Sequence, residues 1–122
     1  MKKRIFVLED NEDLRELFTI IFQDENYEVT AFATVTAFRE YKGALPDLYL
    51  LDIMLPDGDG LDICKEIKDD NLTTHIPVVL MSAHADAVET TQRTKSNGFV
   101  AKPFDVDHLT KYISIKLNAR IY

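Results

Sequence analysis

The chain has 122 residues, of which 46% are hydrophobic and 29% are charged, a composition that indicates a folded globular domain and excludes a disordered or fibrous protein. Its formal charge of -7 repels nucleic acid and anionic membranes, so we expect neither as a partner of this domain. No apolar run reaches the roughly 18 residues of a membrane span. The only cysteine, Cys64, has no intrachain disulfide partner, so we expect a cytoplasmic protein in which Cys64 is buried as an apolar residue.

The first half of the chain predicts two units, each a strand followed by a helix. In chain order the segments are residues 4–8, 14–22, 27–32 and 35–41. The strand segments are short apolar or β-branched runs, whereas the helical segments place apolar residues three and four positions apart. Asn11 is expected to cap the start of the first helix, and Gly43 the end of the second.

The second half predicts three more units of the same kind. Their segments are residues 48–55, 61–67, 77–81, 86–97, 98–101 and 106–117. Segment 86–97 is polar almost throughout, so its helix has few apolar side chains to pack, and Asp105 is expected to cap the last helix. Five units in strict alternation predict an α/β fold, with a doubly wound five-stranded parallel sheet covered by helices on both faces. We expect residues 1–122 to form this single domain.

Asp52 lies within the apolar segment 48–55, where an unpaired ionised carboxylate would be costly to bury. In an open doubly wound sheet the carboxyl ends of the strands meet at one edge, and ligands bind there. The predicted strands end in Glu9-Asp10, Asp52, Ser82 and Lys102. We therefore expect the partners of Asp52 to lie at that edge.

The residue types at this edge suit phosphoryl chemistry. Three carboxylates that lie together repel one another unless a cation intervenes, and an oxygen-only set of ligands favours Mg²⁺. An incoming phosphoryl group would meet the metal, the ammonium of Lys102 and the hydroxyl of Ser82. An aspartate carboxylate such as that of Asp52 can attack phosphorus and form an acyl phosphate.

The chain resembles a response-regulator receiver domain from end to end, most closely the small single-domain, chemotaxis-receiver-like type. The matching residues occur in order and on the expected elements. They are Glu9-Asp10, Asp52 within the sequence LLDIMLP, Gly60, Ser82-Ala83, and the sequence GFVAKPF at 98–104. The resemblance implies a flavodoxin-like fold of five β/α units with the strand order 2-1-3-4-5.

By this resemblance Asp52 is the phosphoacceptor. Asp10 is a direct ligand of Mg²⁺, Glu9 holds the metal through water, and Asp52 and the backbone carbonyl of Met54 are further ligands. Met54 and His84 flank the phosphoryl group and tune the lifetime of the phosphorylated form.

The resemblance also implies a switch. Ser82 and Lys102 bind the phosphoryl group, the Lys102–Pro103 peptide bond is cis, and Phe99 occupies the aromatic switch position. The poorly packed segment 86–97 is the element expected to move. The surface that changes is formed by the fourth helix, the fifth strand and the fifth helix.

These features predict a phospho-accepting switch of a two-component or phosphorelay system. Asp52 takes a phosphoryl group, with the help of Mg²⁺, from a phosphohistidine on a sensor histidine kinase or a histidine phosphotransfer protein. A downstream protein or an attached effector domain then responds. Such a domain promotes only its own phosphorylation and dephosphorylation, so we do not expect a conventional enzyme. The main alternative is a non-phosphorylated pseudo-receiver that acts as a protein-interaction module.

Other interpretations fit the sequence less well. Asp57-Gly-Asp-Gly suggests a calcium loop, but Asp62 stands where that motif needs glycine and Lys68 where it needs glutamate, so a solvated turn is expected. His75 and His84 lack a second histidine at chelating spacing. A flavodoxin-like cofactor binder would need a phosphate-binding loop after the first strand, where this chain has an acidic loop. An aspartyl-phosphate phosphatase would need its nucleophile on the first strand.

Overall fold

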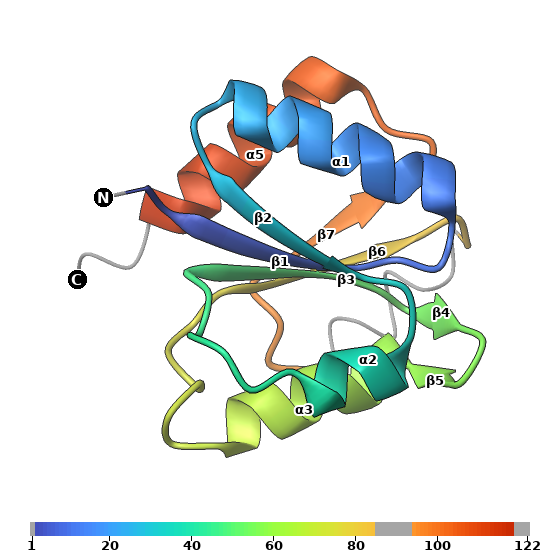
Figure 1. The fold of residues 1–122 in the computed structure, drawn as a ribbon, viewed down its shortest axis with the longest axis vertical. Helices are drawn as coiled ribbons and strands as arrows, with labels where there is room; N and C mark the ends of the chain where they lie inside the picture. The colour runs from blue at the N-terminus through green and yellow to red at the C-terminus, as the bar shows by residue number, and fades with distance from the viewer. Residues whose placement is uncertain (1, 85–93, 119–122) are drawn as a thin grey trace.

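The computed structural model describes residues 2–84 and 94–118, and these residues build one five-stranded sheet with helices on both faces (Figure 1). The strands of this sheet are β1 (Arg4–Leu8), β2 (Glu28–Phe32), β3 (Leu48–Asp52), β6 (Val78–Ser82) and β7 (Gly98–Ala101). Their order is β2-β1-β3-β6-β7, and every neighbouring pair is parallel. The predicted fold class and the strand order 2-1-3-4-5 are confirmed.

The helices lie in two layers (Figure 1). Helices α1 (Glu12–Asp24) and α5 (Val106–Asn118) cover one face of the sheet, and α2 (Val35–Glu40) and α3 (Gly60–Asp69) cover the other. This arrangement follows from right-handed crossovers between parallel strands, which bring successive helices to either face of the sheet. None of the described helices is both long and apolar enough to cross a membrane.

Side chains that alternate along each strand fill the two cores. In β1, Phe6 and Leu8 pack in the core on the α2/α3 side, whereas Ile5 and Val7 pack in the core on the α1/α5 side. Because both faces are covered, β1 is apolar from Ile5 to Leu8 and does not alternate with polar residues there. Cys64 of α3 is fully buried in the first of these cores, as predicted.

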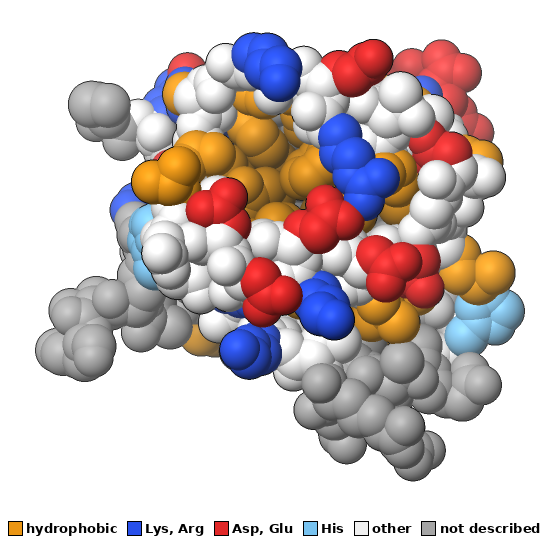
Figure 2. Space-filling model, turned by 90° about the horizontal axis from the view of Figure 1, so that it is seen from below, with side chains coloured by type: hydrophobic (Ala, Val, Ile, Leu, Met, Phe, Trp, Pro, Cys, Tyr) orange, Lys and Arg blue, Asp and Glu red, His pale blue; other side chains and the backbone are white. Residues whose placement is uncertain are grey.

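The α2/α3 face also carries many charged side chains. Figure 2 shows this face, on which acidic and basic side chains surround a hollow with a hydrophobic floor. Arg39 of α2 and Glu66 of α3 form an ion pair across the two helices. Both side chains are more than half exposed, so we expect this pair to contribute little to stability.

Two of the predicted helix caps are present. The side chain of Asn11 accepts a hydrogen bond from the backbone N–H of Leu14 at 2.9 Å. Asp105 accepts one from the N–H of His108 at 3.0 Å. Each cap satisfies a donor in the first turn of a helix that has no partner within the helix itself.

The predicted end of α2 was wrong. The helix ends at Glu40, and Tyr41 is its C-cap with an extended backbone, so Gly43 does not terminate it. The ring of Tyr41 meets the rings of Phe6 and Phe32 edge to face, with centroid distances of 5.2 and 5.5 Å. Packing of this aromatic side chain on the sheet takes the chain out of the helix before the glycine is reached.

The segment 48–55 differs from the prediction, and the segment 86–97 is described only at its end. The apolar segment 48–55 divides, because β3 ends at Asp52 and Met54–Leu55 (β4) pairs with Gly58–Asp59 (β5) in a small antiparallel hairpin. The predicted helix 86–97 falls largely on residues 85–93, which lie outside the described residues. Its last residues, 94–97, form a turn and bend rather than a helix.

Candidate functional site

Three carboxylates lie together at the carboxyl edge of the sheet. Glu9 and Asp10 follow β1 and Asp52 ends β3, and these two strands are neighbours. Each residue offers a carboxylate oxygen, and these oxygens all lie within 4.8 Å of one another. Glu9 and Asp52 are only 1% and 6% exposed, whereas Asp10 is open to solvent. All the ligand atoms offered are oxygens, and the exposed Asp10 leaves one side of the cluster open to water. Both features fit the preference of Mg²⁺ for carboxylates and water.

Lys102 supplies the positive charge of this cluster. Its Nζ lies 2.5 Å from Oε1 of Glu9 and 3.1 Å from Oδ2 of Asp52. The lysine directly follows β7, and its side chain is 16% exposed. The buried carboxylate of Asp52 therefore has a partner within the protein, which satisfies the requirement that a buried charge be paired.

Burial and ion pairing shift the pKa values of Glu9 and Lys102 in opposite directions. Burial raises the pKa of Glu9, although the hydrogen bonds from Lys102 and from the N–H of Asn11 oppose this effect. For Lys102, burial lowers the pKa, but the hydrogen bond to Glu9 and the charge of Asp52 outweigh it and leave the pKa above its usual value. Lys102 is thus an ammonium at neutral pH.

Arg15 of α1 holds the loop that carries the first two carboxylates. Its guanidinium Nη1 donates to the backbone carbonyls of Glu9 at 3.0 Å and Asp10 at 2.8 Å. The N–H of Asn11 also donates to Oε2 of Glu9 at 3.1 Å. Sequence reasoning missed Arg15, because the only available signal was a basic residue in the otherwise acidic first turns of a helix.

The backbone around Asp52 is held by neighbouring segments. The N–H of Ile53 donates to the carbonyl of Met81 at 3.0 Å, and the N–H of Met54 lies 3.3 Å from Oδ1 of Asp52. A Cβ at Gly60 would overlap the backbone carbonyl of Asp52, so only glycine allows α3 to start this close to the strand. The side chain of Met54 is 59% exposed at the rim of the site.

The strand register brings Ser82 to the same edge. Ser82 ends β6 opposite Ala101, so it lies beside the strand position that precedes Lys102. The N–H of Lys102 donates to the carbonyl of Ser82 at 2.9 Å, and Oγ of Ser82 accepts from the N–H of His84 at 3.0 Å. Ser82 is buried, His84 is exposed, and the Lys102–Pro103 peptide bond is cis.

Phe99 is not part of the carboxylate cluster. It is half-buried and packs against the hydrophobic core on the α2/α3 side of the sheet. It shares β7 with the approach to Lys102, so any shift of this strand affects both residues.

Asp57 has a structural role that sequence reasoning missed. Its carboxylate accepts hydrogen bonds from the N–H of Val35 at 2.8 Å and from the N–H and hydroxyl of Thr36 at 2.9 and 2.7 Å. These bonds lower the pKa of Asp57. The acidic turn therefore caps α2 from a distant loop, which agrees with the rejection of a calcium loop.

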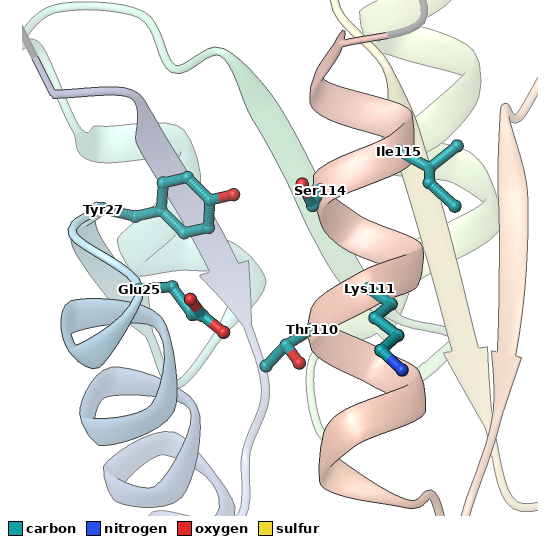
Figure 3. Close-up of a pocket in the computed structure, with 6 residues that line it drawn as sticks. All are labelled: Glu25, Tyr27, Thr110, Lys111, Ser114 and Ile115. Atoms are coloured by element: carbon teal, nitrogen blue, oxygen red, sulfur yellow. The ribbon is translucent and has the colours of Figure 1, made fainter.

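A separate pocket lies on the side of the sheet that is covered by α1 and α5. Figure 3 shows this pocket of about 350 Å³ between the end of α1 and α5. Its lining residues are Glu25, Tyr27, Thr110, Lys111, Ser114 and Ile115. None of them belongs to the carboxylate cluster, so the candidate site is the polar edge of the sheet rather than this pocket.

Known proteins share the sequence pattern. The family model described as the response regulator receiver domain matches residues 5–114. The DNA-binding response regulator MtrA of Mycolicibacterium smegmatis is 32% identical over 123 residues, which cover 96% of this chain and 51% of MtrA. The response regulator PleD of Caulobacter vibrioides is 39% identical over 109 residues, 86% of this chain and 24% of PleD. The chain thus spans about half of the first relative and a quarter of the second.

Solved structures share the fold. A CheY-like response regulator receiver domain protein from Methanospirillum hungatei superposes with a TM-score of 0.88 at 22% identity, covering 98% of this chain and 97% of that one. The response regulator DrrB of Thermotoga maritima, an OmpR/PhoB homologue, gives a TM-score of 0.87 at 25% identity, covering 98% of this chain and 54% of DrrB. With the family match over residues 5–114, these findings show that the chain belongs to the response regulator receiver domains of phosphorylation-based two-component signalling.

Proposed function

We propose that the chain is a switch in which Asp52 accepts a phosphoryl group from a phosphohistidine. A carboxylate oxygen of Asp52 forms the new O–P bond while the P–N bond of the donor breaks, and the imidazole leaves with that electron pair. The donor is a sensor histidine kinase or a histidine phosphotransfer protein. The single observation that supports this proposal is the cluster of Glu9, Asp10 and Asp52 with the ammonium of Lys102.

Each residue of the cluster has a role in the proposal. Asp10 would hold Mg²⁺ directly, Glu9 would hold it through water, and Asp52 and the carbonyl of Met54 would be the further protein ligands. Bound Mg²⁺ supplies positive charge that lowers the repulsion between the carboxylates and an incoming phosphoryl group.

Other side chains bind the transferred group. Lys102 leaves Glu9 to pair with a phosphoryl oxygen, and Ser82 donates its hydroxyl to another. Met54 and His84, at the rim of the site, set how easily water reaches the acyl phosphate and therefore its lifetime. The chain promotes these steps on itself alone.

The output follows from the movement of Ser82 and Lys102. Ser82 ends β6 and Lys102 directly follows β7, so a stronger acceptor at Asp52 shifts the backbone of both strands and moves Phe99. The surface that includes β7 and α5 then binds a downstream protein or an attached effector domain in the cytoplasm. Phosphorylation biases an existing equilibrium between two conformations by its different affinity for them.

The test is the intact mass of the chain after incubation with acetyl phosphate, with and without Mg²⁺. We expect a single phosphoryl adduct that requires the metal and is absent in Asp52→Asn. A matched control is Asp62→Asn, which removes an exposed carboxylate from α3 and leaves the adduct intact. Loss of the adduct in both variants, or an adduct that persists in Asp52→Asn, would contradict the assignment. No adduct in a wild-type chain that binds Mg²⁺ would favour the pseudo-receiver, a protein-interaction module.

A further inference from the structure

Tyr112 of α5 reaches the strand that carries Phe99. Its hydroxyl Oη accepts a hydrogen bond from the backbone N–H of Phe99 at 3.0 Å. β7 is the last strand in the order of the described sheet, with β6 on one side only. The tyrosine hydroxyl therefore takes the place that a strand would otherwise occupy, and it does so at the switch position itself.

The approach of Tyr112 to β7 is close. A Cβ added to Gly98 would overlap Oη of Tyr112, so a side chain at this position would displace the hydroxyl. Glycine thus allows the tyrosine to reach the strand edge. The contact joins α5 to the residue that precedes Phe99 as well as to Phe99.

Neighbours on α5 hold the tyrosine ring. The ring of His108 stacks on it at a centroid distance of 6.2 Å, and Nζ of Lys116 lies 5.3 Å from its centroid. The three residues are four positions apart, so they share one face of the helix. The stacked ring of His108 and the ammonium of Lys116 over the tyrosine ring restrict its movement and so favour a defined position of the hydroxyl relative to α5.

We infer that the hydroxyl of Tyr112 couples the position of β7 to α5 and so carries the switch from Phe99 to the helix. The inference rests on the proposed function, since it needs Lys102 to move β7. Lys102 lies three residues after Phe99, so a pull on the lysine changes the position of the Phe99 N–H. A strand joined to α5 by this hydrogen bond moves the helix, whereas a strand that lacks the bond moves alone. Tyr112 is thus a positioning residue.

The test uses amide NMR to compare the chemical-shift changes near Asp52 with those along α5. The probe is beryllofluoride with Mg²⁺, a stable analogue of the phosphoryl group. In the wild type we expect shifts at Asp52, Ser82 and Phe99 and also along α5. In Tyr112→Phe the shifts at Asp52 and Ser82 remain, while those along α5 fall by at least half. The Phe99 amide should also exchange about five-fold faster, the ratio expected for one hydrogen bond of typical net strength.

The matched control is Tyr27→Phe. Tyr27 is a half-buried tyrosine that packs against the same core as Tyr112, and it lines the pocket of Figure 3. This variant should leave the α5 shifts and the Phe99 exchange rate as in the wild type. A role limited to packing would instead make the two tyrosine variants alike in both measurements.

Three results would overturn the inference. Undiminished α5 shifts in Tyr112→Phe would show that the hydroxyl does not carry the change. Wild-type shifts confined to the neighbourhood of Asp52 would show that α5 does not respond, and would leave the proposed phosphorylation intact. A wild-type protein without any shift, and without a phosphoryl adduct by mass, would overturn the proposed function and the coupling together.

Discussion

Replacing Lys102 by methionine tests whether this lysine neutralises the carboxylates in the absence of metal. Methionine keeps the unbranched apolar stem and removes the ammonium that lies 2.5 Å from Glu9 and 3.1 Å from Asp52. The two buried carboxylates then face each other with oxygens no more than 4.8 Å apart. Two unit charges at that distance repel by about 3.5 kcal/mol at an effective dielectric constant of about 20.

Proton uptake by one of the two carboxylates limits the repulsion between them. We therefore expect Lys102→Met to lower the unfolding free energy by about 3 kcal/mol at neutral pH. This value is at the lower end of the cost of breaking a buried ion pair. Urea unfolding followed by circular dichroism, in a buffer that contains a chelator, measures this loss. Lys65→Met is the matched control because Lys65 is exposed on α3, and it should change the unfolding free energy by no more than about 0.5 kcal/mol.

Saturating Mg²⁺ provides the second half of the same test. The ion restores positive charge to the cluster. Because the cluster of Lys102→Met is more negative than that of the wild type, bound Mg²⁺ stabilises the variant more. The difference between Lys102→Met and the wild type should therefore shrink when Mg²⁺ replaces the chelator. A loss below 1 kcal/mol, or a difference that Mg²⁺ leaves unchanged, would refute the charge balance described for Glu9, Asp52 and Lys102.

Three further predictions follow from the same geometry. Without divalent metal, Asp52→Asn should be at least as stable as the wild type, because it removes repulsion with Glu9 and leaves the Lys102–Glu9 pair in place; a clear drop in melting temperature would contradict this. Arg15→Met should weaken Mg²⁺ binding about tenfold in calorimetric titrations, since the loop loses two donors, and an unchanged Kd would exclude this role. Burial raises the pKa of Tyr49 to about 12, so the unfolded chain ionises first as pH rises above 10, and stability is lost between pH 10 and 12. Between pH 10 and pH 12 the wild type should therefore lose about 2 kcal/mol more unfolding free energy than Tyr49→Phe loses, as measured by urea unfolding. An equal loss in both proteins over this pH range would contradict the prediction.

The sequence by itself determined the fold class and the edge of the sheet at which the three carboxylates gather. Apolar runs that alternate with helical periodicity specify parallel strands with covered faces, and the topology rules then bring the strand ends to one edge. Glu9, Asp10 and Asp52 were predicted to meet because each follows or ends such a run, and the structure brings their carboxylates together. The caps at Asn11 and Asp105 were also predictable, since each acts within its own turn.

Only the tertiary structure decided how side chains from distant segments pair. Lys102 bonds Glu9 across 93 positions of the chain, and Asp57 caps α2 from more than 20 positions away. Such partners depend on strand register and helix packing, which no local pattern encodes. At Gly43 a local signal was overruled, because the ring of Tyr41 packs on the sheet and ends α2 earlier. The bond between Tyr112 and Phe99 likewise exists because packing places α5 beside the edge of β7.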